Sequence, residues 1–499
     1  MPRHDSALSL FAVAAVLMAT FAGCRDAELP VRVVTPRAAV RTEIATAPVV
    51  NSLADDGDGT CTDEKCTLRD AIAFADASGT ITFSVTGTIT LAQGQLVISK
   101  GLTIQGPGAP QLAIDGNHTY RIFCVASGIV AISDLTVRNG NGAAGPPNPS
   151  CSPAVTIGGG ILNFTTLTLT NLAVLANDNS AAANAVAEGG GIYNASDGRL
   201  TVVASTIAGN LSDTGGGIEN IDGTVTIINS TIAGDTAVNA GGVGNTGSMT
   251  LVNSTVADNV GTTATGGVGD FRGEMLLMNT IVANNPDGGD CTGPITTDFG
   301  YNLADDATCG FTAATSLSNT NAALEPAGLA NNGGPTLTIN LLAGSPAIDA
   351  IPFGTNLCGT TNTADQRGTT RPVNGRCDIG AVEVTSPGGF FPPINNVRTT
   401  PIHPGAGVPV QFTLGGDHGL AIFAAGSPGS VEIACRLSDD PGEEIPTTTA
   451  GNSGLSYDPN TDTYTYVWKT DKAWAGTCRR LVVTFADGSV RTADFSFER

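Results

Sequence analysis

The stretch STIAGN at residues 205–210 is the strongest indication of architecture in the chain, because it returns at a nearly constant spacing. It recurs as STIAGD at 230–235, as STVADN at 254–259 and as TIVANN at 280–285, so one phrase is repeated every 24 to 26 residues. Periods of about 20 to 50 residues are typical of proteins in which similar structural units stack on one another. An elongated repeat is therefore expected, rather than one compact core for all 499 residues.

Each repeat opens with a short alternating segment that predicts a β-strand. Apolar residues stand at every second position, which places them on one face of the strand. The segments are LTVVA at 200–204, VTIIN at 225–229, MTLVN at 249–253 and MLLMN at 275–279. The last position has the same parity as the apolar ones. Asn229, Asn253 and Asn279 are therefore predicted to point inward at a bend and to form a ladder of stacked amides.

A second strand of each unit begins at glycines, which suit tight corners that need a positive φ angle. These strands are GGGIYN at 189–194, GGGIEN at 215–220, GGVGN at 241–245 and GGVGD at 266–270. Short strands in units of about 25 residues, without helical periodicity, predict the coils of a parallel β-helix. Residues 67–77, TLRDAIAFADA, have Leu68, Ala71, Ile72 and Ala75 at helical spacing, which predicts an amphipathic helix that caps the N-terminal end.

The chain begins with a segment typical of export. An apolar stretch at residues 7–22 follows Arg3 and is short for a membrane span. FAGC at 21–24 resembles the lipobox of bacterial lipoproteins. This resemblance implies that residues 1–24 are a signal peptide, that Cys24 is lipidated and that residues 25–50 are a tether. The alternative is ordinary signal-peptidase cleavage and secretion.

Export also fits the cysteine count, because eleven cysteines leave ten once Cys24 is set aside. An oxidising compartment favours disulfides, and pairing of sequence neighbours is predicted because each couple lies within one candidate unit. The predicted pairs are Cys61 with Cys66, Cys124 with Cys151, Cys291 with Cys309, Cys358 with Cys377, and Cys435 with Cys478. Four histidines and the lack of a CxxC motif disfavour zinc.

The composition disfavours nucleic acid as a partner. The net charge is -22, and only four lysines occur, so phosphate neutralisation by clustered basic residues is not expected. Beyond the N-terminus no uninterrupted apolar run is long enough for a membrane span, so the membrane is expected as a partner only through the N-terminal lipid.

Three motifs carry a family resemblance that covers roughly residues 50–385. CTDEKCTLRDAI at 61–72 resembles the CSLREA motif, whereas NNGGPTLTINLLAGSPAIDA at 331–350 and ADQRGTTRPVNGRCDIGAVE at 364–383 resemble the choice-of-anchor Q domain. The resemblance implies a right-handed parallel β-helix of pectin-lyase-like architecture on the bacterial surface. Residues 51–80 would then be the cap, 81–300 the β-helix, and 301–384 a choice-of-anchor Q-like C-terminal part of the β-helix.

A Pro- and Gly-rich linker at 385–396 precedes a segment of different composition at 397–499. Its alternating strands predict a small immunoglobulin-like β-sandwich, and residues 457–481 resemble the PxKD type of extracellular module. Tyr464, Tyr466 and Trp468 share one strand face. They are predicted either to pack in the core or to form a stacking platform for sugars.

Few residues indicate chemistry. Asp55, Asp56 and Asp58 offer oxygen ligands at a calcium-like spacing, with a solvated turn as the alternative. The corner column Asn177, Asn210, Asp235, Asn259 and Asn285 holds one carboxylate, which is not an acid and base pair. Arg272 with Asp270 and Glu274 fits a solvated loop. Asp365, Arg367 and Arg371 are expected to form charge pairs that close the C-terminal coil, so no catalytic residue is predicted.

The sequence therefore predicts a non-enzymatic β-helix scaffold, a lipoprotein of the cell surface or outer membrane or else a secreted protein. Adhesion or binding of a polysaccharide or a host or cell-surface ligand is the expected role, because a long regular polar face suits weak repeated contacts. The alternative is a carbohydrate-active enzyme, a polysaccharide lyase or hydrolase. Apart from calcium, no cofactor is expected.

Overall fold

The computed structural model describes most of the chain beyond the N-terminal segment. The described residues are 47–142, 151, 156–180, 187–293, 295–342, 345–373, 376–384, 390, 394, 399–412, 414, 418–433, 435, 444–449, 454–459, 463–486, 488 and 490–498. The predicted signal peptide, Cys24 and most of the predicted tether lie outside this part. No helix within it is both long enough and apolar enough to cross a membrane.

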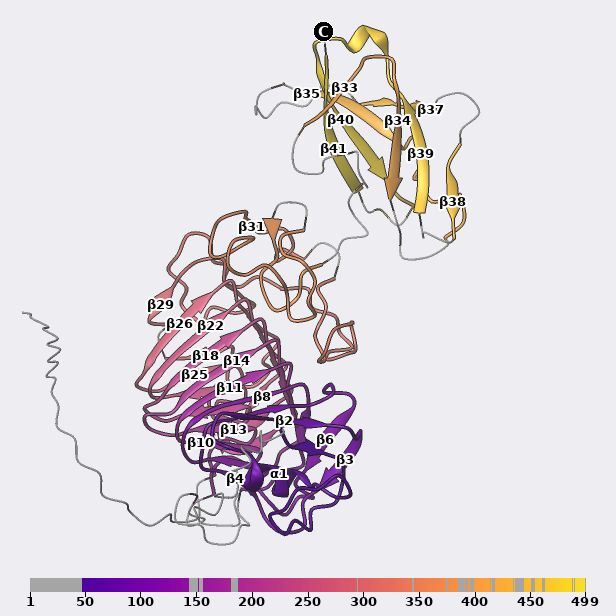
Figure 1. Ribbon diagram of the computed structural model, residues 1–499. Coiled ribbons are helices and arrows are strands. Elements are labelled where there is room, and N and C mark those ends of the chain that lie inside the picture. Colours follow the sequence, from indigo (N-terminus) through magenta and orange to yellow (C-terminus); the bar gives the residue numbers. More distant parts are fainter. Residues whose placement is uncertain are drawn as a thin grey trace, which may run out of the picture. The chain divides into compact units, whose positions relative to one another are not determined.

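Three long parallel sheets run through residues 49–304, and successive coils of the chain add one strand to each (Figure 1). The first sheet has ten strands: β1 (Val49–Val50), β2 (Gly79–Phe83), β5 (Leu102–Gln105), β8 (Ile129–Ser133), β11 (Thr166–Thr170), β14 (Arg199–Val203), β18 (Thr224–Ile228), β22 (Ser248–Val252), β26 (Glu274–Met278) and β29 (Thr297–Asp298). The predicted parallel β-helix is confirmed.

The other sheets follow the same order. The second has β3 (Gly87–Thr90), β6 (Leu112–Asp115), β9 (Thr136–Arg138), β12 (Ala173–Leu175), β15 (Thr206–Ala208), β19 (Thr231–Ala233), β23 (Thr255–Ala257), β27 (Ile281–Ala283) and β30 (Leu303–Ala304). The third has β4 (Leu96–Ile98), β7 (Phe123–Val125), β10 (Ile161–Asn163), β13 (Ile192–Asn194), β17 (Ile218–Asn220), β21 (Val243–Asn245), β25 (Val268–Asp270) and β28 (Cys291–Thr292). A short fourth sheet has β16 (Leu211–Thr214), β20 (Thr236–Asn239) and β24 (Val260–Gly261).

The register of the first sheet stacks equivalent apolar side chains inside the β-helix. Leu200 pairs with Val225, which pairs with Met249, and all three are at most 1% exposed. Each buried aliphatic side chain removes apolar surface from water, and a full side chain contributes about 1.5–3 kcal/mol. Because every coil offers the same residue types at the same positions, neighbouring coils pack without offset.

Amide ladders also run inside the stack, at the ends of the third-sheet strands. Each side-chain amide donates to the oxygen of the next, at 2.7, 2.8, 2.8 and 3.1 Å along Asn163, Asn194, Asn220, Asn245 and Asp270. A second ladder runs along the corner column. The side-chain amides of Asn177 and Asn210 donate to the side-chain oxygens of Asn210 and Asp235, at 2.8 Å each, and Asn259 donates to Asn285 at 3.2 Å. Buried polar groups are thereby satisfied by their equivalents in adjacent coils.

The prediction that Asn229, Asn253 and Asn279 form an amide ladder at the bend after the first sheet is mostly wrong. Asn229, Asn253 and Asn279 have positive φ angles of 47°, 46° and 53°, which end the strand's alternation, so parity no longer fixes where their side chains point. Only Asn279 and Asn253 bond to each other, at 3.1 Å. The Asn229 side chain instead exchanges two hydrogen bonds, 2.8 and 2.9 Å, with Asn362 of a later segment.

Helix α1 (Leu68–Phe74) caps the N-terminal end as predicted. Thr67 and Asp70 form a capping box, and Leu68, Ala71 and Ile72 pack into the core of the β-helix. The tether predicted to reach residue 50 is shorter, because β1 pairs with β2 as the edge strand of the first sheet.

Residues 320–384 do not continue the coils, contrary to the prediction for 301–384. They hold one short antiparallel pair, β31 (Ile351–Pro352) with β32 (Arg376–Cys377), and return along the outer face of the second sheet. Their apolar side chains pack on the outward residues Ala233, Ala257 and Ala283, whereas Ile232, Val256 and Val282 face the interior. We call residues 320–384 the back-folded segment.

Residues 390–498 form two sheets around their own core. One has β33 (Thr400–Ile402), β35 (Gly429–Ile433), β36 (Glu444–Pro446), β40 (Cys478–Thr484) and β41 (Val490–Phe497). The other has β34 (Gly407–Phe412), β37 (Thr448–Thr449), β38 (Ser456–Asp458) and β39 (Thr463–Lys469), and a 3₁₀ turn, η1 (Lys472–Trp474), precedes β40. Phe390 and Ile394 of the predicted linker are buried in this core.

Tyr464, Tyr466 and Trp468 are core residues of this domain, at 0%, 4% and 0% exposure. A sugar-stacking platform needs an open ring face, so that alternative is wrong and the packing alternative holds. The five predicted cysteine pairs are all joined as disulfides.

Candidate functional site

A polar groove lies at the corner where the third sheet turns into the first sheet. It has a volume of about 380 Å³ and spans three successive coils. Its walls and floor are Asp222, Gly223, Thr224, Thr246, Gly247, Ser248, Arg272, Gly273 and Glu274. We call it the corner groove.

The floor of the corner groove is backbone, because a glycine occupies the same place in each coil. A β-carbon on Gly247 would lie 2.2 Å from the carbonyl oxygen of Gly223, and one on Gly273 would lie 2.2 Å from that of Gly247. No side chain fits at such distances, so these positions require glycine for close stacking. The amide groups of Ser248 and Glu274 donate to the same carbonyl oxygens at 2.9 and 2.7 Å.

The amide ladder of the third sheet fixes these turns from inside. Asn220 donates to the carbonyl oxygen of Gly223 at 3.1 Å, and Asn245 donates to that of Gly247 at 3.2 Å. In the next coil Asp270 cannot donate, and its carboxylate accepts from the amide of Gly273 at 3.0 Å instead. In each of the three coils the groove therefore rests on a turn that is hydrogen-bonded to a side chain of the inner ladder.

Asp270, Arg272 and Glu274, for which a solvated loop was expected, are split by the structure. Asp270 is 5% exposed and belongs to the inner ladder, whereas Arg272 and Glu274 are exposed on the groove wall. Within the described residues no hydrogen bond or ion pair engages the Arg272 guanidinium. The groove thus offers one cationic donor group, two carboxylates with Asp222, and the hydroxyl groups of its Thr and Ser residues.

The acids with the most perturbed pKa values lie elsewhere and are sealed from solvent. Burial raises the pKa of Glu219 to about 8, with a further contribution from Glu188, and burial also raises the pKa of Asp235 to about 8. Burial and the neighbouring aspartates raise the pKa of Asp290 to about 8. These three carboxyl groups are at most 2% exposed, so none can reach a polymeric substrate.

Sequence reasoning missed Glu219, which stands on the outward side of the third sheet between Tyr193 and Gly244. Its Oε2 atom is buried without a partner, and a β-carbon on Gly244 would lie 2.0 Å from it. The signal was present in the repeat, because GGGIEN places a charged residue where GGGIYN has tyrosine and GGVGN has glycine.

The three aspartates considered for calcium turn to different partners. Asp55 pairs with Arg69 at 2.8 Å, Asp56 pairs with Lys65 at 2.9 Å, and Asp58 accepts from Thr60 at 2.5 Å. They do not converge, and within the described residues no group of three or more His, Cys, Asp or Glu side chains is arranged for a metal ion.

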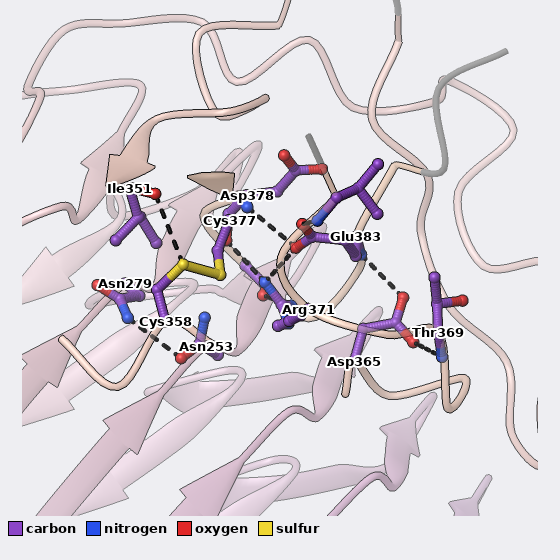
Figure 2. A network of polar contacts seen from close by, with 12 residues as sticks. Asn253, Asn279, Ile351, Cys358, Asp365, Thr369, Arg371, Cys377, Asp378 and Glu383 are labelled. Atoms are coloured by element: carbon purple, nitrogen blue, oxygen red, sulfur yellow. Dashed lines mark hydrogen bonds and ion pairs between the residues drawn. A yellow bond between two sulfur atoms is a disulfide. The ribbon is translucent and has the colours of Figure 1, made fainter. Parts of the chain in front are cut away.

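The charges of the DQRG segment form a buried network within the back-folded segment (Figure 2). Arg371 and Glu383 are both fully buried and lie 2.8 Å apart, and Asp365 pairs with Arg367 at 2.8 Å. The Asp365 carboxylate also accepts from the amide of Glu383 at 2.8 Å. These charge pairs were predicted, but they do not close the last coil. The adjoining Gln366 bonds to Thr206 and Thr231, several coils earlier.

Comparison with known proteins adds no assignment. No protein-family model, curated protein or solved structure matches the chain.

Proposed function

We propose that this protein is a non-enzymatic β-helix scaffold of the bacterial surface that binds a polysaccharide, and that it serves in adhesion or glycan capture. The observation that carries the proposal is the corner groove. It presents hydroxyl groups, two carboxylates and a guanidinium on a rigid backbone floor. Sugar hydroxyl groups both donate and accept hydrogen bonds, so a mixed set of donors and acceptors suits them better than it suits an ion of one sign.

The alternative, a polysaccharide lyase or hydrolase, finds less support. General acid and base catalysis needs carboxyl groups that touch the substrate with suitably placed pKa values. The described acids whose pKa is raised to about 8 are buried, as stated above for Glu219, Asp235 and Asp290.

The surface location rests on the sequence. The lipobox-like FAGC ending at Cys24 supports a lipid anchor, and the CSLREA-like and choice-of-anchor Q-like motifs support membership among bacterial surface proteins. The C-terminal domain is proposed to be an immunoglobulin-like, PxKD-type module. Its two sheets around one core are compatible with that assignment.

The test uses the full chain with Cys24→Ser, purified without lipid and applied to a glycan array and to insoluble polysaccharides. The Cys24→Ser protein with an unaltered corner groove is expected to bind at least one glycan. The double substitution Arg272→Ala and Asp222→Ala is expected to weaken that binding about tenfold, because two charged hydrogen-bonding groups are lost. Lys469→Ala, an exposed cation of the C-terminal domain, is the matched control. Release of new reducing ends or unsaturated products at enzymatic turnover would instead favour the alternative.

A further inference from the structure

The outer face of the first sheet carries a column of threonines next to the corner groove. The central outward residues of successive strands are in register, and all are half-buried. In order they are Thr80, Thr103, Ala131, Thr168, Thr201, Thr226, Thr250, Leu276 and Thr297. Neighbouring strands lie about 4.8 Å apart, so the four residues from Thr168 to Thr250 span roughly 14 Å in three even steps of one coil.

The hydroxyl groups of this column are not bonded to other described residues. Within the described part of the chain, no hydrogen bond is made by the side chains of Thr168, Thr201, Thr226 or Thr250. The central column also carries no charge, although the chain as a whole has a net charge of -22. A partner that matched this surface would therefore be neutral and would bring its own hydrogen-bonding groups.

The second sheet shows what an equivalent threonine column can hold. There Thr206, Thr231 and Thr255 stack in register, and each hydroxyl group is bonded to the back-folded segment. Gln366 donates to Thr206 Oγ1 at 3.0 Å and accepts from Thr231 Oγ1 at 2.6 Å, and Thr255 Oγ1 accepts from the amide of Ala381 at 3.1 Å. The back-folded segment thus docks on one threonine column of this β-helix by hydrogen bonds that step from coil to coil, beside its apolar contacts with Ala233, Ala257 and Ala283.

The flanks of the first-sheet column suit the two kinds of surface that a sugar ring presents. On one side stand Thr224, Ser248 and Glu274, which are themselves walls of the corner groove. On the other side the register places Val203, Ile228 and Met278, which are aliphatic and half-buried. A sugar unit has a rim of hydroxyl groups and an apolar face of C–H groups, and both find a counterpart here.

We propose that the threonine column of the first sheet is the binding track for a neutral, extended polysaccharide, which lies across the coils with the corner groove as its lateral subsite. The proposal rests on the proposed function and adds its location and ligand class. Each hydroxyl group of the column bonds one sugar unit or a bridging water, so affinity grows with the number of coils in contact.

The experiment compares two double variants in the full-length Cys24→Ser protein. Thr226→Val with Thr250→Val removes two hydroxyl groups from the track and keeps β-branched side chains suited to a strand. Thr236→Val with Thr262→Val makes the same change in the same coils, on or beside the fourth sheet. The two variants should have similar unfolding temperatures, so that a difference in binding is not caused by a difference in stability. The probes are suspensions of microcrystalline cellulose, chitin and insoluble mannan, with polygalacturonate as an acidic comparison.

The track variant is expected to bind the best neutral polymer about tenfold more weakly, whereas the control variant retains wild-type affinity. Polygalacturonate should bind least, because the protein is strongly acidic. Equal affinity of wild type and track variant would overturn the track and leave the proposed function intact. If the wild-type protein binds polygalacturonate but none of the neutral polymers, the track is wrong and the proposed function stands. If it binds none of the four polymers and no glycan on the array, both proposals are wrong.

Discussion

Asp235 is the one carboxylate in a column of asparagines, and its neighbours show what it lacks. Asn210 donates to Asp235 Oδ1 at 2.8 Å and also to the carbonyl oxygen of Val174 at 3.1 Å. Asn259 likewise donates to the carbonyl oxygen of Ile232 at 3.1 Å. Asp235 has no side-chain amide with which to donate, and its Oδ2 atom is buried without a partner. An ionised carboxylate here is costly, and burial raises its pKa to about 8.

Asp235→Asn is therefore expected to stabilise the protein, and more so as the pH rises. A carboxyl group whose pKa is raised on folding contributes most below its unfolded pKa of about 4, and this contribution is lost as the pH rises through the folded value. The wild type should lose unfolding free energy between about pH 4 and pH 8 on account of Asp235, and the variant should not. At pH 8 the free energy of unfolding of the variant is expected to exceed that of the wild type by about 2–5 kcal/mol. Denaturant unfolding of both proteins at several pH values between 4 and 8 measures this difference.

The control is Asn259→Asp, which adds a second carboxylate to the same column and should steepen the loss between pH 4 and pH 8. A constant difference between Asp235→Asn and the wild type at every pH would mean that Asp235 titrates in the folded protein as it does in the unfolded chain.

Arg371 is buried with Glu383 at the centre of the network in Figure 2. Its guanidinium also donates to the carbonyl oxygens of Asp378 and Gly380 at 2.8 and 2.7 Å. Arg371→Met should cost about 3–5 kcal/mol of local stability, because it leaves a buried carboxylate without a counter-charge. Hydrogen exchange of residues 365–384 measures this loss.

Adding Glu383→Gln to that variant should recover about 1–2 kcal/mol, since the carboxamide is neutral and its single oxygen still accepts from the amide of either Val373 or Asp378. Strictly additive effects of the two substitutions would contradict direct coupling of the pair.

At the scale of elements, the coils could be predicted from the sequence and the back-folded segment could not. Period-two alternation and the 24 to 26 residue repeat specify which residues stack, because each residue lies next to the equivalent residue of the following coil. The bend asparagines were misassigned because parity fails once a residue takes a positive φ angle, as Asn229 does. The corner groove was visible only as Arg272 and its neighbours. Its floor depends on glycines that stack in three coils.

The back-folded segment has no repeat that could reveal its partner. Its contacts join residues that differ in type, such as Gln366 with Thr231 and Asn362 with Asn229, so neither periodicity nor spacing predicts them. The resemblance of residues 364–383 to a known motif indicated that the segment mattered, and the expectation that it formed further coils was wrong.

Gln366→Ala should release this segment from the second sheet. The side chain is 1% exposed and bonds to Thr206, Thr231, Thr336 and Leu337. Its removal leaves buried hydroxyl groups unsatisfied, at a cost of about 2–4 kcal/mol. Faster hydrogen exchange and proteolysis within residues 320–384, with the coils still protected, is the expected result. Thr363→Ala, which alters an exposed side chain of the same segment, should leave both rates unchanged.

At the scale of the whole molecule, attachment to a membrane is expected to depend on Cys24. The wild-type protein should partition into detergent and incorporate a fatty-acid analogue, because a lipoprotein anchor has more than one acyl chain and holds stably. Cys24→Ser should be secreted or retained as an unmodified precursor. If the wild-type protein is wholly water-soluble and its mature N-terminus is not residue 24, lipidation is contradicted. Ordinary signal-peptidase cleavage and secretion would then be the remaining interpretation of residues 1–24.

The back-folded segment also sets an order of events during biogenesis. Bonds between coils join residues about one repeat apart, such as Asn220 and Asn245, so coils can form one after another as the chain emerges. The bonds from Thr255 to Ala381 and from Thr206 to Gln366 cross 126 and 160 residues. The residues of the second sheet are thus synthesised before those of its cover, and a partly made chain lacks the segment that covers this face. A fragment that ends before residue 366 is expected to stack its coils and to expose this uncovered face, which would make it a target for chaperones and proteases.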